Sequence, residues 1–200
     1  QALWRAPVPN TYHCEYGYSC MGYEVAGAYG CKIACPDQEV YAMCGDGSFD
    51  MLHSELIASI QYGYKINVCL FDNAAYGCIN NLQVGQGNKS RTTEKNMHIP
   101  GTPYDGCDLG PAMNIDYAGV AEAYGCKAYR VKTMEELAAA LEDSKKQTVS
   151  TLIDMKVLPK TMAEGYESWW HIGVASTSKS EKVQEARKRL DQYLSEARMY

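Results

Sequence analysis

Short apolar runs alternate along the chain with stretches in which apolar residues recur at helical spacing. The runs are bounded by glycine, proline or aspartate, and they are too short for ordinary helices; runs of this kind are typical of strands in a parallel sheet that is covered on both faces. Strands are predicted at residues 39–44, 66–71, 128–131 and 149–157. Helices are predicted at residues 21–34, 49–61, 116–124, 134–145 and 183–197.

The alternation of strands and helices predicts an α/β fold with an open, mostly parallel sheet flanked by helices. The first two strands and the helix between them form a βαβ unit, whose crossover is expected to be right-handed. Thr133 is expected to cap the helix that follows it, because Glu136 stands at the spacing of a capping box.

Two stretches do not fit into this sheet. Residues 84–114 are rich in Gly, Pro, Asn and Thr and show no periodicity, so we expect a long loop near a functional site. Near the carboxyl end, a polar and aromatic stretch precedes the last helix, whose apolar stripe is expected to pack on the body of the protein or on a neighbouring subunit. We therefore expect a main domain at residues 1–160 and a tail with a helix at 161–200.

The composition is that of an ordinary globular protein, with 46% hydrophobic and 22% charged residues among 200. The net charge of −5 gives no electrostatic reason to expect nucleic acid or an anionic membrane as a partner. The sequence shows neither a signal peptide nor an apolar run of membrane-spanning length. The chain starts at Gln1, and we interpret it as a piece of a longer chain.

The nine Cys residues form no C-x-x-C pair, and most of them lie inside apolar runs. We therefore expect reduced cysteines that serve as small core residues in a cytoplasmic protein. A metal or iron–sulfur site and disulfides are the alternatives.

Glycines and polar residues mark the ends of the first two predicted strands. Gly45-Asp46-Gly47-Ser48 follows the first strand and Asp72-Asn73 follows the second, so we expect both groups at the same edge of the sheet. The Asp46 carboxylate and the Asn73 amide oxygen can converge there, with a backbone carbonyl just beyond Asn73 as a third ligand. Such an all-oxygen set suits Mg²⁺ that also holds diphosphate oxygens, and the glycines let the backbone approach a phosphate. The alternative is a glycine-rich turn with an Asp cap.

This GDG segment and the Asn that follows it resemble the cofactor motif of thiamine-diphosphate enzymes. The resemblance implies a bound thiamine diphosphate and three Mg²⁺ ligands, namely the carboxylate of Asp46, the side chain of Asn73 and the backbone carbonyl of Ala75. It also implies that the diphosphate lies against Gly45, Gly47 and Ser48. Asp72 departs from the family, in which many members have Asn, but the ligand is the second residue of the pair.

The segment Ser19-Cys20-Met21-Gly22 is similar to a family segment that ends in Met-Gly. The resemblance implies that Met21 lies between the two rings of the cofactor and bends it, and that the carbonyl of Ser19 binds the amino group of the aminopyrimidine. A flexible thioether suits such a gap. The alternative is that Met21 is an ordinary core residue.

Longer segments narrow the resemblance to the carboxyl-terminal region of the trihydroxycyclohexane-1,2-dione hydrolases of myo-inositol catabolism. These segments are GDGSFDMLHSELIASIQYGYKINVCLFDN at 45–73, CINNLQ at 78–83, the stretch at 145–170 and ARMY at 197–200. The resemblance implies hydrolysis of a carbon–carbon bond in a small cyclic dione, with 5-deoxyglucuronate as the product. It also implies that the fold is incomplete at its N-terminus, and that a pyrimidine-binding domain with an activating Glu belongs to the parent chain or to another subunit of a homo-oligomer. The chain alone is then expected to be inactive.

Three further residues are candidates for contact with a substrate. By resemblance, Cys78 and Ile79 stand at positions that face the substrate, and His13 lies just before the segment that binds the rings. Two other functions stay open: another thiamine-diphosphate enzyme, such as an acetolactate synthase or decarboxylase, and a non-catalytic cofactor-binding or assembly module. Intact Asp46 and Asn73 argue against the module.

Overall fold

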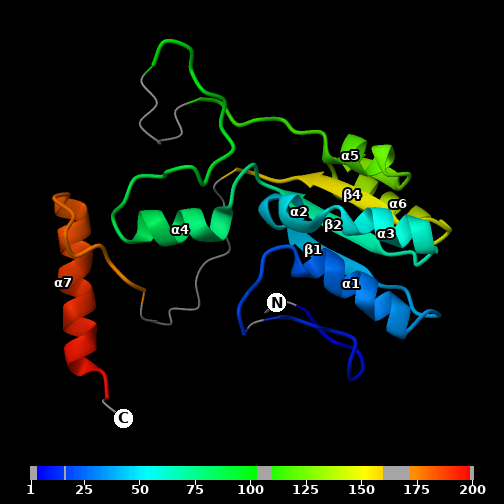
Figure 1. The fold of residues 1–200 in the computed structure, drawn as a ribbon, viewed down its shortest axis with the longest axis horizontal. Coiled ribbons are helices and arrows are strands. Elements are labelled where there is room, and N and C mark those ends of the chain that lie inside the picture. Colours follow the sequence, from blue (N-terminus) through cyan, green and yellow to red (C-terminus); the bar gives the residue numbers. More distant parts are fainter. Residues whose placement is uncertain (1–3, 16, 103–109, 160–171, 199–200) are drawn as a thin grey trace.

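The computed structural model describes residues 4–15, 17–102, 110–159 and 172–198. It contains a sheet of four parallel strands in the order β1-β2-β4-β3 (Figure 1). The strands are β1 (Tyr41–Gly45), β2 (Asn67–Asp72), β3 (Lys127–Val131) and β4 (Thr151–Lys156). The open parallel α/β sheet predicted from the sequence is therefore confirmed, and each strand lies within a few residues of its predicted range.

Helices cover the two faces of the sheet unequally. One face packs into the main core against α1 (Tyr23–Ala34), α2 (Asp46–Leu52), α3 (Glu55–Tyr62) and α5 (Tyr117–Ala123). The other face packs against α6 (Met134–Ser144), whose capping box with Thr133 is present as predicted. On this second face Met43 of β1 is 48% exposed and Phe71 of β2 is 43% exposed. The expectation that β1 is covered on both faces is therefore wrong in this structure.

One helix differs from its prediction near the end of β1. The helix expected at residues 49–61 begins three residues earlier, at Asp46, and it is divided into α2 and α3 at His53 and Ser54. The division is a tight turn, in which the N–H groups of Leu56 and Ile57 donate to carbonyls three residues earlier. Asp46 therefore lies in the first turn of a helix directly after the strand.

The segment after β2 contains a helix that the hydrophobic pattern did not predict, α4 (Gly77–Gly85). Beyond it, Gly87 has a φ of +79° and lies against the start of α7 (Glu181–Glu196), where an added Cβ would come within 2.5 Å of the Lys182 carbonyl oxygen. The apolar stripe of α7 forms a separate small core of Val174, Val183, Ala186 and Leu190. Figure 1 shows the sheet at one end of the molecule and α7 at the other, with α4 between them.

The cysteines differ from the expectation of a core role. Eight of them lie in the described part of the chain and all eight are free thiols, but five of these are exposed. The buried ones are Cys44, Cys69 and Cys126, and burial raises the pKa of each thiol. Among the described helices, none is long and apolar enough to cross a membrane.

Candidate cofactor and metal site

The residues singled out at the ends of β1 and β2 meet at one edge of the sheet. Gly45 at the end of β1 pairs with Phe71 of β2, so Asp46 follows the one strand at the level where Asp72 and Asn73 end the other. This arrangement confirms that both polar groups lie at the carboxyl ends of neighbouring parallel strands. Open α/β sheets bind their ligands at such edges.

Asp46 is a fully buried carboxylate, with an exposed fraction of 0%. Its charged partner is the ammonium of Lys95, whose Nζ lies 2.8 Å from Asp46 Oδ2. Burial raises the pKa of Asp46, and the nearby Lys95 ammonium counteracts that rise. A buried carboxylate without hydrogen bonds is costly unless a cation compensates it.

Asp72 shapes the turn that carries Asn73 and Ala75. Its Oδ1 accepts a hydrogen bond from the Ala74 N–H at 2.9 Å, and Ala74 has a φ of +53°. Its Oδ2 accepts from Lys156 Nζ at 2.5 Å. The buried Ala75 follows this turn, and no N–H group in the described chain donates to its carbonyl in a backbone hydrogen bond. The turn therefore leaves the predicted third ligand available.

The donor set and the charge at this edge fit a hard divalent cation. One carboxylate, one amide oxygen and one carbonyl are ligands that Mg²⁺ accepts, with its other positions left for phosphate oxygens and water. Ion pairs form two sets here, Asp46 and Asp50 with Lys95 and Asp72 and Asp154 with Lys156, so that each ammonium is shared by two carboxylates. No cluster of three or more His, Cys, Asp or Glu side chains suited to a metal occurs in the described ranges. A metal at this edge therefore needs the mixed set.

Gly47 and Met21 lie next to each other, although they are far apart in the sequence. A Cβ added at Gly47 would come within 2.6 Å of Tyr76 Cδ1 and 3.3 Å of Met21 Cε. The structure thus places the predicted ring-binding residue against the predicted diphosphate-binding glycine. Ser48, in the same turn, is half-buried, whereas Ser19 is exposed with a φ of +53°. The cofactor contacts of these residues stay predictions.

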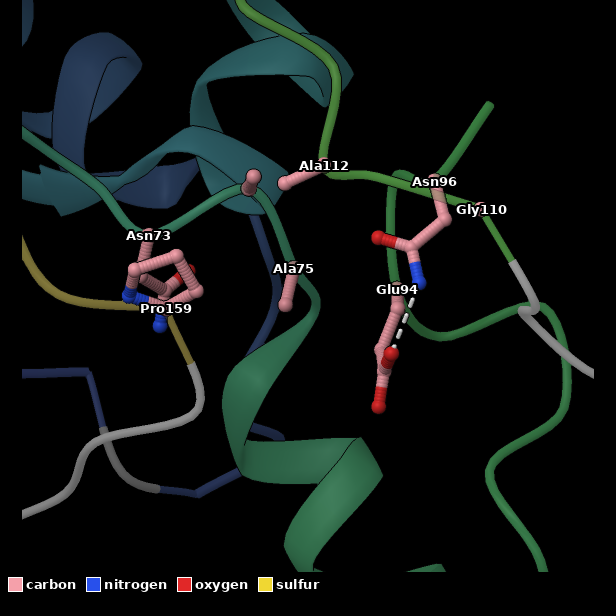
Figure 2. A pocket seen from close by; sticks show the side chains of 8 residues that line it. Asn73, Ala75, Glu94, Asn96, Gly110, Ala112 and Pro159 are labelled. Atoms are coloured by element: carbon pink, nitrogen blue, oxygen red, sulfur yellow. Dashed lines mark hydrogen bonds between the residues drawn. The ribbon is translucent and has the colours of Figure 1, made fainter.

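A cavity of about 210 Å³ opens beside the candidate ligands. Figure 2 shows Asn73 and Pro159 on one side of it, Glu94 and Asn96 on the other, and Ala75 between them. Asn96 Nδ2 donates to Glu94 Oε2 at 2.9 Å across its far wall. This volume is below the range of typical small-molecule pockets, so the cavity suits one end of a larger ligand.

The three candidate substrate residues lie on the surface. His13 is exposed, and its Nε2 is 2.5 Å from the hydroxyl of Tyr23. Cys78 and Ile79 are exposed in the first turn of α4. Their contact with a substrate stays a prediction.

Sequence reasoning missed the residue that touches Asp46. Lys95 comes from the aperiodic segment expected to lie near the site, and its Nζ is 2.8 Å from Asp46 Oδ2 and 2.5 Å from Asp50 Oδ2. Burial alone would lower the pKa of Lys95, but its contacts with the two carboxylates raise the pKa above the ordinary value. The position of the segment near the site is thus confirmed, whereas nothing in its spacing could have identified Lys95.

Known proteins are similar to this chain both in sequence and in structure. The family model "Thiamine pyrophosphate enzyme, C-terminal TPP binding domain" matches residues 1–155; thiamine pyrophosphate is the same compound as thiamine diphosphate. A solved thiamine diphosphate-dependent 4-hydroxybenzoylformate decarboxylase of Rhodococcus jostii is similar with a TM-score of 0.52 and 25% identity, over 70% of this chain and 23% of that one.

Curated relatives match the whole chain at higher identity. Proteins named 3D-(3,5/4)-trihydroxycyclohexane-1,2-dione hydrolase are 58% identical in Bacillus licheniformis and Bacillus subtilis and 59% identical in Geobacillus thermodenitrificans. Each match covers 100% of this chain and 30–31% of the relative, so the chain spans about a third of these proteins' length. With the family model matching most of its residues, the chain belongs to the thiamine pyrophosphate enzymes, as their carboxyl-terminal cofactor-binding domain.

Proposed function

We propose that this chain is the cofactor-binding part of a thiamine-diphosphate-dependent hydrolase that opens the ring of trihydroxycyclohexane-1,2-dione to 5-deoxyglucuronate in myo-inositol degradation. The observation that carries the proposal is the 58–59% identity to hydrolases of that name over the whole chain. Residues 1–160 would form the cofactor domain and residues 161–200 a tail. The separate apolar core around α7 supports that division.

The metal in this proposal is Mg²⁺, held by the Asp46 carboxylate, the Asn73 side chain and the Ala75 carbonyl. The full burial of Asp46, and the two carboxylates of Asp46 and Asp50 that share the single ammonium of Lys95, support this assignment. The diphosphate would lie against Gly45, Gly47 and Ser48; at Gly47 the missing Cβ lets the Tyr76 ring and Met21 pack closely against the turn.

The other residues orient the cofactor and its substrate. Met21 would support the bent cofactor from the side of Gly47, and the carbonyl of Ser19 would accept a hydrogen bond from the aminopyrimidine. His13, Cys78 and Ile79 would face the substrate. When bound, thiamine diphosphate supplies the carbon nucleophile and the electron sink that carbon–carbon cleavage requires. The activating Glu would come from a pyrimidine-binding domain, in the same longer protein or in another subunit of a homo-oligomer.

The overall reaction adds one water across the broken bond. Cleavage of the bond at the dione leaves one carbon as a carboxylate, which takes oxygen from water, while its former neighbour takes a proton. The ring thereby becomes an open-chain acid without any external oxidant. We propose that this takes place in the cytoplasm, since every cysteine of the described chain is a free thiol.

Another thiamine-diphosphate enzyme is the second candidate, and the likeness to a decarboxylase favours it. That likeness reaches 25% identity over 70% of the chain, against 58% over the whole chain for the hydrolases. A non-catalytic module is the third candidate, but a module that had lost the cofactor would have no reason to keep a fully buried carboxylate at Asp46, whose burial is costly.

The test is an activity assay of the full-length protein that carries this chain. We expect ring opening of the cyclic dione that depends on both thiamine diphosphate and Mg²⁺. A matched assay offers pyruvate and an aryl 2-oxo acid in place of the dione. Turnover of a 2-oxo acid with no turnover of the dione would establish the second candidate instead.

A further inference from the structure

Lys95 places a positive charge on the carboxylate proposed to bind the metal. Its ammonium lies 2.8 Å from Asp46 Oδ2, 2.5 Å from Asp50 Oδ2 and 2.8 Å from the hydroxyl of Tyr117. The Lys95 side chain is 9% exposed and that of Asp46 is 0% exposed. The ammonium therefore compensates, inside the protein, the charge that a divalent cation would otherwise compensate.

The ammonium and a metal ion cannot both stay close to Asp46 without strong repulsion. A Mg²⁺ ion binds carboxylate oxygen at about 2.1 Å, so an ammonium in its present place would lie within about 7 Å of a metal on either oxygen of Asp46. Charges in such a buried region are screened much less than charges on the surface. Binding of the metal thus favours withdrawal of Lys95 from Asp46.

The Lys95 ammonium has a second carboxylate partner close to Asp46. Asp50 already contacts the ammonium, and its side chain is 32% exposed, so it lies toward solvent relative to Asp46. The backbone of Lys95 is fixed, because its N–H donates to the Ala74 carbonyl at 2.8 Å and its carbonyl accepts from the Met113 N–H at 2.7 Å. We therefore expect withdrawal by rotation of the side chain, with these backbone hydrogen bonds kept.

We propose that Lys95 is a built-in competitor of the metal: it pairs with both Asp46 and Asp50 when the metal is absent, and it leaves Asp46 and keeps only Asp50 when the metal binds. The inference rests on the proposed function, because it requires a divalent cation at Asp46. Lys95 keeps the empty site compensated, and the balance between its two carboxylate partners sets the affinity for the cation.

The test is calorimetric titration of the full-length protein with MgCl₂ at saturating thiamine diphosphate. Lys95→Met removes the competitor and is expected to tighten Mg²⁺ binding about tenfold. Asp50→Asn removes the alternative partner and is expected to weaken binding several-fold, because Lys95 then stays on Asp46. In the Lys95→Met background, Asp50→Asn is expected to have no effect, which the double-mutant cycle measures.

Lys65→Met is the matched control. Lys65 is equally buried, and its Nζ pairs with Glu39 Oε1 at 3.0 Å beside the start of β2, at the other end of that strand. We expect its Mg²⁺ affinity to equal that of the unsubstituted protein. If Lys95→Met does not fold, Lys95→Gln replaces it, since an amide can still donate to Asp50 and Tyr117.

Each other outcome is decisive. Equal or weaker Mg²⁺ binding by the Lys95 variant overturns the competitor role. An Asp50→Asn effect of the same size in both backgrounds also overturns it, because a general loss of negative charge then explains the weakening. If the folded, unsubstituted protein binds neither Mg²⁺ nor thiamine diphosphate, the proposed function itself fails.

Discussion

Gly47 is the position where one added methyl group tests the geometry of the candidate site most sharply. In Gly47→Ala the new Cβ would lie 2.6 Å from Tyr76 Cδ1 and 3.3 Å from Met21 Cε. Carbon atoms that are not bonded to each other approach to about 3.5–4.0 Å, so the ring of Tyr76 has to move by roughly 1 Å. The substitution therefore overpacks the space between α2, Met21 and the turn after β2.

The expected magnitude combines a penalty and a smaller gain. Overpacking of a well-packed site costs about 1–3 kcal/mol, whereas alanine in place of glycine in a helix stabilises by about 0.5–1 kcal/mol. We expect a net loss of about 1–2 kcal/mol in the free energy of unfolding. For a chain of this size the melting temperature falls by roughly 2–4 °C per kcal/mol, which predicts a decrease of about 2–8 °C.

The assay is thermal unfolding followed by circular dichroism, with calorimetric titration of thiamine diphosphate at saturating Mg²⁺. Gly30→Ala is the matched control, because Gly30 lies inside α1 and an added Cβ there meets nothing within 4 Å. We expect the control to gain about 0.5–1 kcal/mol and to keep its cofactor affinity. If Gly47→Ala is as stable as the control and binds the cofactor equally well, the packing of Tyr76 and Met21 on Gly47 is refuted.

Three further changes test other parts of the structure. Thr133→Ala removes the capping box of α6 and should lower the free energy of unfolding, measured with urea, by about 1 kcal/mol without altering cofactor affinity. An unchanged unfolding midpoint would contradict a stabilising role of the capping box. In the protein without metal, Lys95→Met leaves Asp46 unpaired and should lower the free energy of unfolding by about 3 kcal/mol. Saturating Mg²⁺ and thiamine diphosphate should reverse that loss, and a loss of the same size with and without them would show a purely structural role of Lys95. Burial raises the pKa of Asp154 above its unfolded value, and Lys156 counteracts the rise only in part. The folded state therefore holds the proton of Asp154 more tightly than the unfolded state does, and the free energy of unfolding falls as the pH rises from about 4. Urea unfolding at a series of pH values should show a smaller fall for Asp154→Asn, and an unchanged dependence of the unfolding free energy on pH would refute the raised pKa of Asp154.

The sequence predicted those parts of the fold in which the local pattern agrees with the final packing. Buried apolar runs became β2 and β4, and Thr133 with Glu136 formed the expected capping box. The meeting of Asp46 and Asn73 followed from one rule, because the carboxyl ends of neighbouring parallel strands share an edge. The pattern did not show that one face of β1 stays exposed, since that depends on which helices cover the sheet.

The helix α4 was not predictable because long-range contacts stabilise it. Its sequence is rich in Asn and Gly, which have weak helix propensity. The buried side chain of Asn80 donates to Ser90 Oγ at 2.6 Å and to Thr93 Oγ1 at 2.9 Å, ten and more residues away. Tertiary hydrogen bonds of this kind leave no periodic signal in the sequence.

The contact of Lys95 with Asp46 could not be predicted from the sequence for a related reason. Its partner Asp46 precedes it by almost fifty residues, and the intervening chain has to fold before the two charges meet. No spacing rule joins a lysine in an aperiodic segment to a carboxylate at a strand end. The order of the strands, with β4 between β2 and β3, likewise depends on pairing between distant segments, such as Thr151 Oγ1 donating to Asn67 Oδ1 at 2.8 Å.

The measurement that tests the central claim most directly is the binding of thiamine diphosphate to the full-length protein, by calorimetry, with and without Mg²⁺. Asp191→Ala is the matched control, because Asp191 is an exposed carboxylate of α7 whose surface ion pair with Arg187 contributes little to stability. We predict binding that requires the cation, that the control retains and that Asp46→Ala abolishes. Undiminished binding by folded Asp46→Ala protein, or equal binding without any divalent cation, would contradict the site at the ends of β1 and β2.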